Sequence, residues 1–329
     1  MGVTIRDVAK QADVSISTVS RVLNDTCPVH SEKRVRVERA VAELGYTPNP
    51  AARSLLTRET GGIGIILPFV SGEFFSEFLN GVDEAAQEED YFLLISTSHH
   101  SSDDLKKAMR GMYKRVDGLL VMAPQMSTAE VRDLAPAGIP LVFVNTRFVE
   151  ENPEGITFDN YGGMYAMTTH LVSKGHRRIG FITGPKDAYD AQERLRGYRK
   201  ALQDVGIAED EELILNGEYD QKTGFERTKT LLALEQRPTA IMASNDDSAI
   251  GVLSALREQG VAIPEEMAVT GFDDVPSARY ASPPLSSVHV PVRELGSAAI
   301  RLLTERLKND RLDSTLRTLP VALNLRQTS

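Results

Sequence analysis

The first 24 residues place apolar and polar positions at the spacing of two short helices. Four apolar residues recur at i, i+3, i+4 and i+7, the pattern of one helix face: Ile5, Val8, Ala9 and Ala12. Thr4 and Ser15 can each cap the start of a helix, and Asp13 interrupts the pattern between them. Three further apolar residues would face inward from the second helix: Val19, Val22 and Leu23. The pattern therefore predicts a helix, a tight turn and a second helix.

Two more helices are predicted before residue 60. One runs from Ser31 to about Leu44, with a glycine directly after it. Asn49 as a cap, with Pro50 at the first helical position, predicts another, short one within residues 46–60. So short a helix is marginal alone in water. We expect it to order only against DNA or a second copy of the chain.

From about Gly61, apolar runs alternate with amphipathic stretches. The runs predict buried strands at residues 62–67, 91–96, 118–123, 140–145, 178–183, 240–244 and 267–272. The stretches predict helices near residues 75–89, 104–115, 127–137, 161–174, 192–205, 222–234 and 247–259. Such alternation predicts a parallel sheet covered on both faces. The series is too long for one sheet, so we expect two similar lobes divided near Asp159.

The second predicted helix carries short hydroxyl side chains and one arginine on its exposed face. This combination suits the major groove of DNA. A small helical bundle without a nucleic-acid role is the alternative that the spacing alone leaves open, because two-helix patterns are common.

An ordered series of sequence blocks resembles the LacI/GalR family of bacterial transcription regulators. It begins with VTIRDVAKQADVSISTVSRVLN and GYTPNPAARSLLT. It continues through IGIILP, ITFDNYGG, KGHRRIGFITGP, ERLRGYRKAL, ASNDDSAIGVLSALREQGVAIPEEMAVTGFDD and SPPLSSVHVP. The series covers essentially the whole chain and is far more specific than a helix-turn-helix alone. It implies an α/β protein with an N-terminal helix-turn-helix DNA-binding head. The core would be periplasmic-binding-protein-like, with two lobes of doubly wound parallel sheets.

The resemblance also implies the domain organisation. Residues 1–46 would form the DNA-binding head, residues 47–60 a linker with a short hinge helix, and residues 61–329 an effector-binding and dimerisation core. In this fold the chain crosses between the lobes three times, here near residues 160, 290 and 320. Lobe 1 is then expected at about 61–159 plus 292–319, and lobe 2 at about 160–290 plus 320–329.

Residues at the start of the second helix should meet base edges, and three are expected to do so: Ile16, Ser17 and Arg21. Arginine pairs with guanine through two hydrogen bonds, whereas Ile16 offers only apolar contact, as to a thymine methyl. Four residues are expected to contact phosphates, which position a protein without specifying sequence: Thr4, Ser15, Thr18 and Asn24. Leu55 matches the leucine that the family wedges into the minor groove, where it kinks the duplex.

The family comparison assigns six side chains to a small-molecule effector between the lobes: Phe74, Phe75, Arg194, Tyr219, Asn245 and Asp273. Aromatic faces suit the C–H face of a sugar or the plane of a base, and the polar side chains suit hydroxyl groups. We therefore expect a sugar or a sugar derivative. Two alternatives remain open: Phe75 as an ordinary core residue, and Asp273 with Asp274 as the cap of a helix near Pro276.

Composition is that of a soluble globular protein, with 329 residues of which 41% are hydrophobic and 25% charged. No apolar run approaches the roughly 18–20 residues that span a bilayer, and the N-terminus lacks the apolar core of a signal peptide. Cys27 is the only cysteine, so neither an intrachain disulfide nor a cysteine zinc site is expected. Together these features predict a cytoplasmic protein without a cofactor, a metal or a membrane partner.

The net charge of −9 is unevenly distributed. Residues 1–60 hold nine of the 37 Lys and Arg residues and seven of the 46 Asp and Glu residues, so they carry +2 and the remainder −11. A charge of +2 attracts phosphates only modestly, so we expect a homodimer on a palindromic, double-stranded operator. The closing stretch LPVALNLRQTS is strand-like, and no heptad repeat follows it, which favours a dimer over a tetramer.

Other function classes fit less well. No G-x-x-x-x-G-K-[ST] phosphate loop occurs, residues 62–67 lack the third glycine of a dinucleotide fingerprint, and no nucleophile–base pair stands out, so we expect no enzyme. A transport binding protein would leave residues 1–60 unexplained. We predict a sequence-specific transcriptional regulator, a repressor controlled allosterically by its effector. A regulator controlled by a partner protein such as a phosphocarrier remains the alternative.

Overall fold

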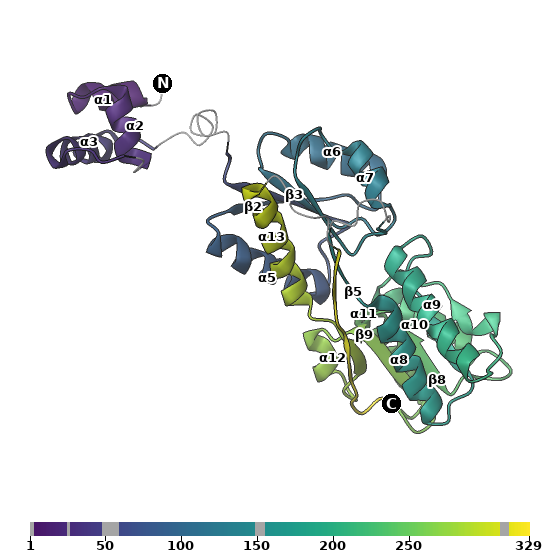
Figure 1. Cartoon of the computed structure of the whole chain (residues 1–329). Helices are drawn as coiled ribbons and strands as arrows, with labels where there is room; N and C mark the ends of the chain where they lie inside the picture. The colour runs from purple at the N-terminus through teal and green to yellow at the C-terminus, as the bar shows by residue number, and fades with distance from the viewer. Residues whose placement is uncertain (1–2, 25–26, 48–58, 149–154, 310–315) are drawn as a thin grey trace. The chain divides into compact units, whose positions relative to one another are not determined.

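The computed structural model describes residues 3–24, 27–47, 59–148, 155–309 and 316–329. They belong to two compact units, Met1–Thr60 and Gly61–Ser329 (Figure 1). The first unit contains α1 (Ile5–Gln11), α2 (Ile16–Asn24) and α3 (Ser31–Leu44). These three helices confirm the first three predicted ones, whereas the short helix predicted within residues 46–60 lies outside the described residues. The three helices pack around a small apolar core whose most buried members are Val8, Val19 and Val37.

Local chemistry explains where these helices begin and end. Both the backbone N–H and the hydroxyl of Thr4 donate to Asp7, at 2.9 and 2.7 Å, so the start of α1 is capped. Gly45 ends α3 in the left-handed region, with φ of +61°. A side chain at this position would be strained, which is why glycine commonly follows a helix.

The second unit contains two six-stranded sheets. Lobe 1 is built on the sheet with the order β11-β5-β4-β3-β1-β2. Its strands are β1 (Gly62–Leu67), β2 (Phe92–Thr97), β3 (Gly118–Val121), β4 (Leu141–Val144), β5 (Gly155–Phe158) and β11 (Leu316–Leu319). Every pairing in it is parallel. Its helices are α5 (Glu73–Glu88), α6 (Ser102–Met112), α7 (Thr128–Leu134) and α13 (Val292–Lys308).

Alternation along β1 shows how lobe 1 is layered. Ile63 and Ile65 pack into the core cluster that includes α5 and α13, whereas Ile66 packs into the cluster that includes α6 and α7. Successive side chains of a strand point to opposite faces, so helices cover both faces of this sheet (Figure 1).

Lobe 2 repeats the plan with the order β12-β10-β9-β8-β6-β7. Its strands are β6 (Ile179–Ile182), β7 (Ile214–Leu215), β8 (Ala240–Ala243), β9 (Ala268–Asp273), β10 (Ser286–His289) and β12 (Ala322–Asn324). Its helices are α8 (Asn160–Ser173), α9 (Tyr189–Asp204), the 3-10 turn η1 (Glu211–Leu213), α10 (Gln221–Leu232), α11 (Asp246–Glu258) and α12 (Pro276–Tyr280). β12 runs antiparallel to β10, an edge pairing that the expectation of wholly parallel sheets did not include.

Two sequence expectations need correction. The strand predicted at residues 91–96 is not buried, because β2 is an edge strand: Phe92 and Ile95 are 55% and 45% exposed. The predicted series of helices also omits α13, whose buried residues, such as Leu295 and Ile300, pack in the core of lobe 1.

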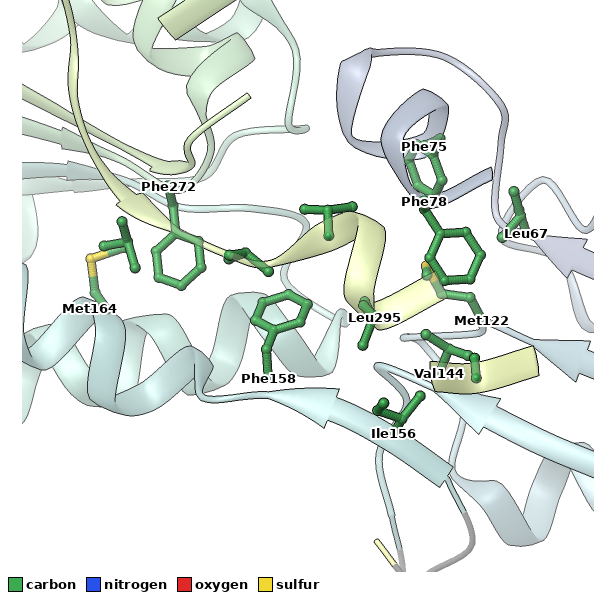
Figure 2. Packing of buried hydrophobic residues seen from close by; sticks show 14 of the residues in the cluster. Leu67, Phe75, Phe78, Met122, Val144, Ile156, Phe158, Met164, Phe272 and Leu295 are labelled. Atoms are coloured by element: carbon green, nitrogen blue, oxygen red, sulfur yellow. The ribbon is translucent and has the colours of Figure 1, made fainter. Parts of the chain in front are cut away.

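The chain passes between the lobes at three places: β5 to α8, β10 to α13, and β11 to β12. One apolar cluster runs through both lobes at these crossings. Figure 2 shows it from Phe75 and Phe78 of α5 to Phe272 of β9, and the rings of Phe158 and Phe272 lie 6.3 Å apart. The lobes thus share a core beside the crossings.

We predict that Gly81→Ala destabilises the chain, because an added Cβ would lie 1.9 Å from the carbonyl oxygen of Arg293, where α5 packs against α13. Overpacking of this kind lowers the free energy of unfolding by about 1–3 kcal/mol. The matched control is Gly111→Ala in α6, where nothing lies within 4 Å and a gain of up to about 1 kcal/mol is expected. Urea unfolding of both variants checks this; equal stability would contradict the packing described.

Candidate functional site

The outward face of α2 carries the residues predicted to read bases. Ile16 is 44% exposed, and Ser17 and Arg21 are also exposed. Val19 and Val22, on the opposite side, are buried in the small core. The helix is therefore amphipathic, with an accessible face of apolar, hydroxyl and guanidinium groups.

Hydroxyl groups gather at the beginning of α2. The Ser15 Oγ lies 2.8 Å from the Ser17 Oγ and 2.9 Å from the Thr18 Oγ1, and it accepts a hydrogen bond from the Thr18 N–H at 3.2 Å. Helix N-termini favour anions such as phosphate, so this cluster has the polarity that a phosphate contact needs.

The other predicted DNA contacts are placed less favourably or not at all. The Thr4 hydroxyl already donates to Asp7, and these Thr4 hydrogen bonds lower the pKa of the Asp7 carboxyl. Asn24 is the last residue of α2. Leu55 lies outside the described residues.

A cavity of about 670 Å³ opens between the two lobes of the second unit. Many of its lining residues directly follow strands, such as Pro68 after β1, Asn145 after β4 and Asn245 shortly after β8. The cavity therefore lies at the carboxyl edges of both sheets, where α/β folds bind ligands. All six residues predicted to contact an effector line it: Phe74, Phe75, Arg194, Tyr219, Asn245 and Asp273.

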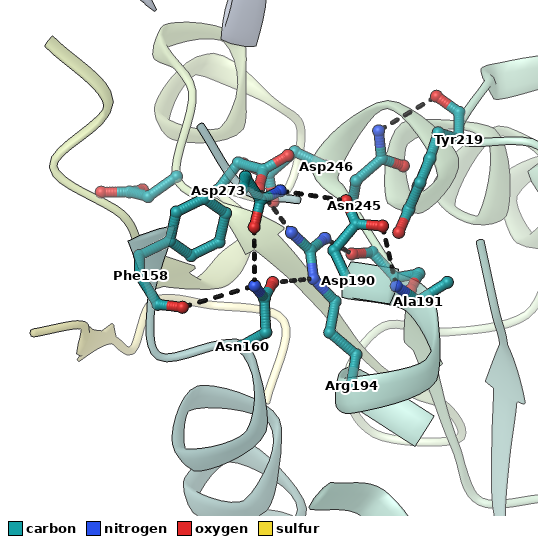
Figure 3. Close-up of polar contacts among 12 residues, drawn as sticks. Phe158, Asn160, Asp190, Ala191, Arg194, Tyr219, Asn245, Asp246 and Asp273 are labelled. Carbon is teal, nitrogen blue, oxygen red and sulfur yellow. Dashed lines mark hydrogen bonds and ion pairs between the residues drawn. The ribbon is translucent and has the colours of Figure 1, made fainter. Parts of the chain in front are cut away.

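Arg194 of α9 is the buried cation of this site, with 3% of its surface exposed. Its Nε donates to the Asn160 Oδ1 at 2.9 Å, and one terminal nitrogen donates to the Ser244 carbonyl oxygen. The guanidinium also lies 3.9 Å from the centre of the Phe272 ring. Figure 3 shows Arg194 beside Asn160 and Asp273. Arg196, two residues on, instead pairs with Glu193 at the surface, so only the first arginine of the pair faces the cavity.

Asn245 and Tyr219 hold each other in place. The Asn245 Oδ1 caps α11 by accepting from the Ser248 N–H at 2.9 Å, and its Nδ2 donates to the Tyr219 carbonyl oxygen at 3.0 Å. Tyr219 has a φ of +62°, a conformation that is uncommon for a bulky residue. The hydrogen bond from Asn245 stabilises that turn, which aims the ring at the cavity.

Asp273 ends β9 and lies 3.5 Å from an Arg194 terminal nitrogen. Burial raises the pKa of the Asp273 carboxyl to about 7, even though Arg194 lowers it. A carboxyl that changes protonation near neutrality can either accept or donate a hydrogen bond there.

The helix-cap alternative for Asp273 and Asp274 is wrong. Val275 precedes α12 without a side-chain cap. Asp274 instead binds three side chains: His289 at 3.1 Å, Asn324 at 2.5 Å and Arg326 at 2.6 Å. The alternative for Phe75 is not exclusive, since its ring belongs to the core cluster and also lines the cavity.

Comparison with known proteins decides the family. The model of bacterial regulatory proteins of the lacI family matches residues 4–49, and that of a periplasmic binding protein-like domain matches residues 168–329. The ribose operon repressor of Haemophilus influenzae is 39% identical over 307 residues, which cover 93% of this chain and 92% of that protein.

The chain belongs to the LacI family of bacterial regulatory proteins. The HTH-type transcriptional repressor PurR of Vibrio atlanticus is 36% identical over 309 residues, covering 93% of this chain and 92% of that one. The structure also matches the lac repressor dimer bound to operator and the anti-inducer ONPF, with a TM-score of 0.91, 28% identity and coverage of 100% and 99%. The predicted fold is confirmed, and the chain is a DNA-binding transcriptional regulator.

Sequence reasoning missed several residues around the LacI-family cavity. His100 lines it, with its ring 5.3 Å from that of Phe69. Asn145 and Asp190 line it from lobe 1 and lobe 2. Position directly after a strand could have indicated Asn145, whereas nothing in the local sequence marks Asp190.

Two kinds of feature are absent from the described parts of the chain. No helix there is long and apolar enough to cross a membrane. Likewise, the described His, Cys, Asp and Glu side chains form no group of three or more that could hold a metal ion.

We predict that Asp273 makes stability depend on pH. Its folded-state pKa of about 7 lies above the ordinary 3.8, so between these values the folded chain binds more protons than the unfolded chain. The free energy of unfolding should therefore fall as the pH rises from about 4 through about 7, by up to about 1.4 kcal/mol per pH unit. Asp273→Asn should remove this contribution, as measured by urea unfolding from pH 5 to 8. The exposed Asp187→Asn is the control; parallel curves for all three proteins would contradict the prediction.

Proposed function

We propose that this LacI-family regulator is a repressor that binds a palindromic operator as a homodimer and responds to a small, uncharged sugar in the interlobe cavity. Residues 1–46 would be its DNA-binding head, 47–60 its hinge linker and 61–329 its effector-binding core. It would act in the cytoplasm. The observation that carries the proposal is the cavity around Arg194, in which directional polar groups and aromatic rings converge.

The balance of charge in the cavity supports a neutral ligand. Five carboxylates line it: Asp190, Glu218, Asp220, Asp247 and Asp273. Arg194 is the one Lys or Arg among the described lining residues, and its hydrogen bonds are already directed to protein groups. A phosphate would meet this negative field with no free cation to pair it. Carboxylates and amides do suit the hydroxyls of a sugar, whose C–H faces can pack on Phe74 and Tyr219.

The relatives support the same reading. One is named for a ribose operon, and the chain covers 92% of its length. They are named as repressors rather than enzymes, which supports a cavity used for binding and not for catalysis.

The head supports DNA binding through the exposed face of α2. Arg21 is the residue there that can make two hydrogen bonds to guanine, while Ile16 can meet a thymine methyl. The hydroxyl cluster at Ser15, Ser17 and Thr18 would then fix the register on the phosphates. Leu55 would wedge into the minor groove at the centre of the site.

The edge of lobe 1 supports a homodimer. β2 is an edge strand, and the side chains of Phe92 and Ile95 are about half exposed there. Exposed apolar edges promote aggregation unless they are covered. The solved lac repressor structure that matches the whole chain is a dimer. A second copy of this chain is therefore the occupant that we propose for this edge.

A ligand screen tests the proposed effector. We expect neutral monosaccharides such as D-ribose to raise the melting temperature and to change operator affinity, and their phosphates and free nucleobases to do neither. Arg194→Lys should weaken sugar binding at least about tenfold, because a lysine cannot reproduce the planar set of donors. The surface change Arg196→Lys on the same helix should bind normally. A response only to a phosphorylated ligand, or only to a phosphocarrier protein, would refute the proposal.

Arg21 should set sequence preference. We expect Arg21→Ala to weaken binding to the preferred operator, found by selection from random DNA, by about 1–3 kcal/mol. Binding to unrelated DNA should change much less, because those sequences do not offer Arg21 its guanine. Loss of a phosphate contact would instead weaken binding to all sequences alike. Fluorescence anisotropy at fixed salt measures both. A uniform loss on all sequences would instead make Arg21 a phosphate contact.

The edge of lobe 1 gives a further prediction. Ile95→Lys should shift the chain from dimer to monomer in sedimentation velocity, because it places a charge at a covered apolar edge. Operator affinity should fall with it. The control is Val205→Lys, at an exposed apolar position in lobe 2. An unchanged dimer in the Ile95 variant would exclude this edge as the interface.

A further inference from the structure

Asn160 uses both ends of its side-chain amide at the junction between the lobes. It is the first residue of α8, directly after the crossing that follows β5, and it is 3% exposed. Its Oδ1 accepts from the Arg194 Nε at 2.9 Å (Figure 3), and its Nδ2 donates to the Asn145 Oδ1 at 3.0 Å. One small side chain therefore touches a residue of each lobe.

The chemistry of these partners fixes the orientation of the amide. A guanidinium has donors and no acceptor, so the oxygen of Asn160 must face Arg194 and its NH2 group must face away. The NH2 group then meets the oxygen of Asn145, whose own NH2 group is left to donate to the Asp190 Oδ2 at 3.3 Å. In the series Arg194, Asn160, Asn145 and Asp190, each residue therefore donates a hydrogen bond to the next. Turning one amide around would break the hydrogen bonds on both sides of it.

The two partners of Asn160 both line the cavity, and Asn160 does not appear among its lining residues. Asn145 lies just beyond β4 in lobe 1, and its backbone is in the left-handed region with φ of +44°. Arg194 projects from α9 in lobe 2. Asn160 would therefore act on a ligand indirectly, through these two side chains.

Other contacts join the lobes without involving Arg194. The Tyr189 N–H donates to the Pro124 carbonyl oxygen at 2.9 Å, and the Ser277 N–H donates to the Glu73 Oε2 at 2.8 Å. These two contacts can hold the lobes together, but neither of them involves the guanidinium or fixes its orientation. The amide of Asn160 contacts both Asn145 of lobe 1 and the guanidinium of Arg194, so it couples the position of lobe 1 to the orientation of the guanidinium.

We propose that Asn160 is a positioning residue that sets Asn145 of lobe 1 and Arg194 of lobe 2 in one geometry, so that closing the cleft and aiming the guanidinium are a single event. This inference rests on the proposed function, since the link matters to regulation only if the cavity binds the effector. Removing the link leaves each lobe folded but lets the two contacts vary independently.

Two substitutions separate the two arms of the amide. Asn160→Asp keeps an acceptor for Arg194 but has no donor for Asn145, whose oxygen it would face. Asn160→Ala removes both arms. The control is Asn216→Asp, an exposed residue of lobe 2 that contacts Arg227 through its backbone oxygen. All are made in the full chain with Cys27→Ser, and spin labels are placed on Arg110→Cys of lobe 1 and Gln203→Cys of lobe 2.

We expect Asn160→Asp to broaden the distance distribution between the labels while the Arg194 Nε proton stays as protected from exchange as in the parent. Asn160→Ala should broaden the distribution and speed that exchange as well. D-ribose, used as the probe, should bind about tenfold more weakly to Asn160→Asp. A label distribution in Asn160→Asp that matches the parent and Asn216→Asp would overturn the proposal. If D-ribose fails to bind the parent chain, the proposed effector is at fault, while the label distances still decide the role of Asn160.

Discussion

The buried guanidinium of Arg194 is the constraint on which the core depends. Taking such a cation out of water costs several kcal/mol unless its donors are met. Here the partners come from separate elements: Asn160 at the start of α8, the carbonyl of Ser244 after β8, and Asp273 with the ring of Phe272 in β9. They converge only if lobe 2 and the crossing beside it are both formed. Folding of lobe 2 therefore assembles the side of the cavity that holds Arg194.

That constraint also connects the cavity to the lobes around it. The apolar cluster runs through the crossings, and the rings of Phe158 and Phe272 pack against the guanidinium. Asn160 connects the polar network to lobe 1 through its hydrogen bond with Asn145. A ligand that adds hydrogen bonds from both sides favours the arrangement in which these partners fit together. In a LacI-family regulator, such a preference between two lobe arrangements is what an effector needs to change the affinity for DNA.

The regular helices and strands of this structure can be predicted from the sequence. Features that depend on residues distant in the sequence cannot. β1 was predictable because it is apolar on both faces, as a central parallel strand must be. β2 reads equally apolar, and its exposure follows only from its place at the edge. The family resemblance supplied Arg194 and Asp273. The position of Asn145 directly after a strand could have indicated that it lines the cavity. Its contact with Asn160, 15 residues further on, could not be predicted, because side-chain amides follow no periodicity and the crossing decides which of them meet.

If the cleft and the DNA-binding head share one equilibrium, effector and operator must each change the affinity for the other by the same factor. Calorimetry gives the affinity of the effector identified by screening for the free protein and for the operator-bound protein, and anisotropy gives operator affinity with and without that effector. Linkage requires both ratios to be equal, and a coupling of about 1–3 kcal/mol predicts a factor of about 5–150. Effector affinity that is the same with and without operator would show that the cleft and the head are not coupled.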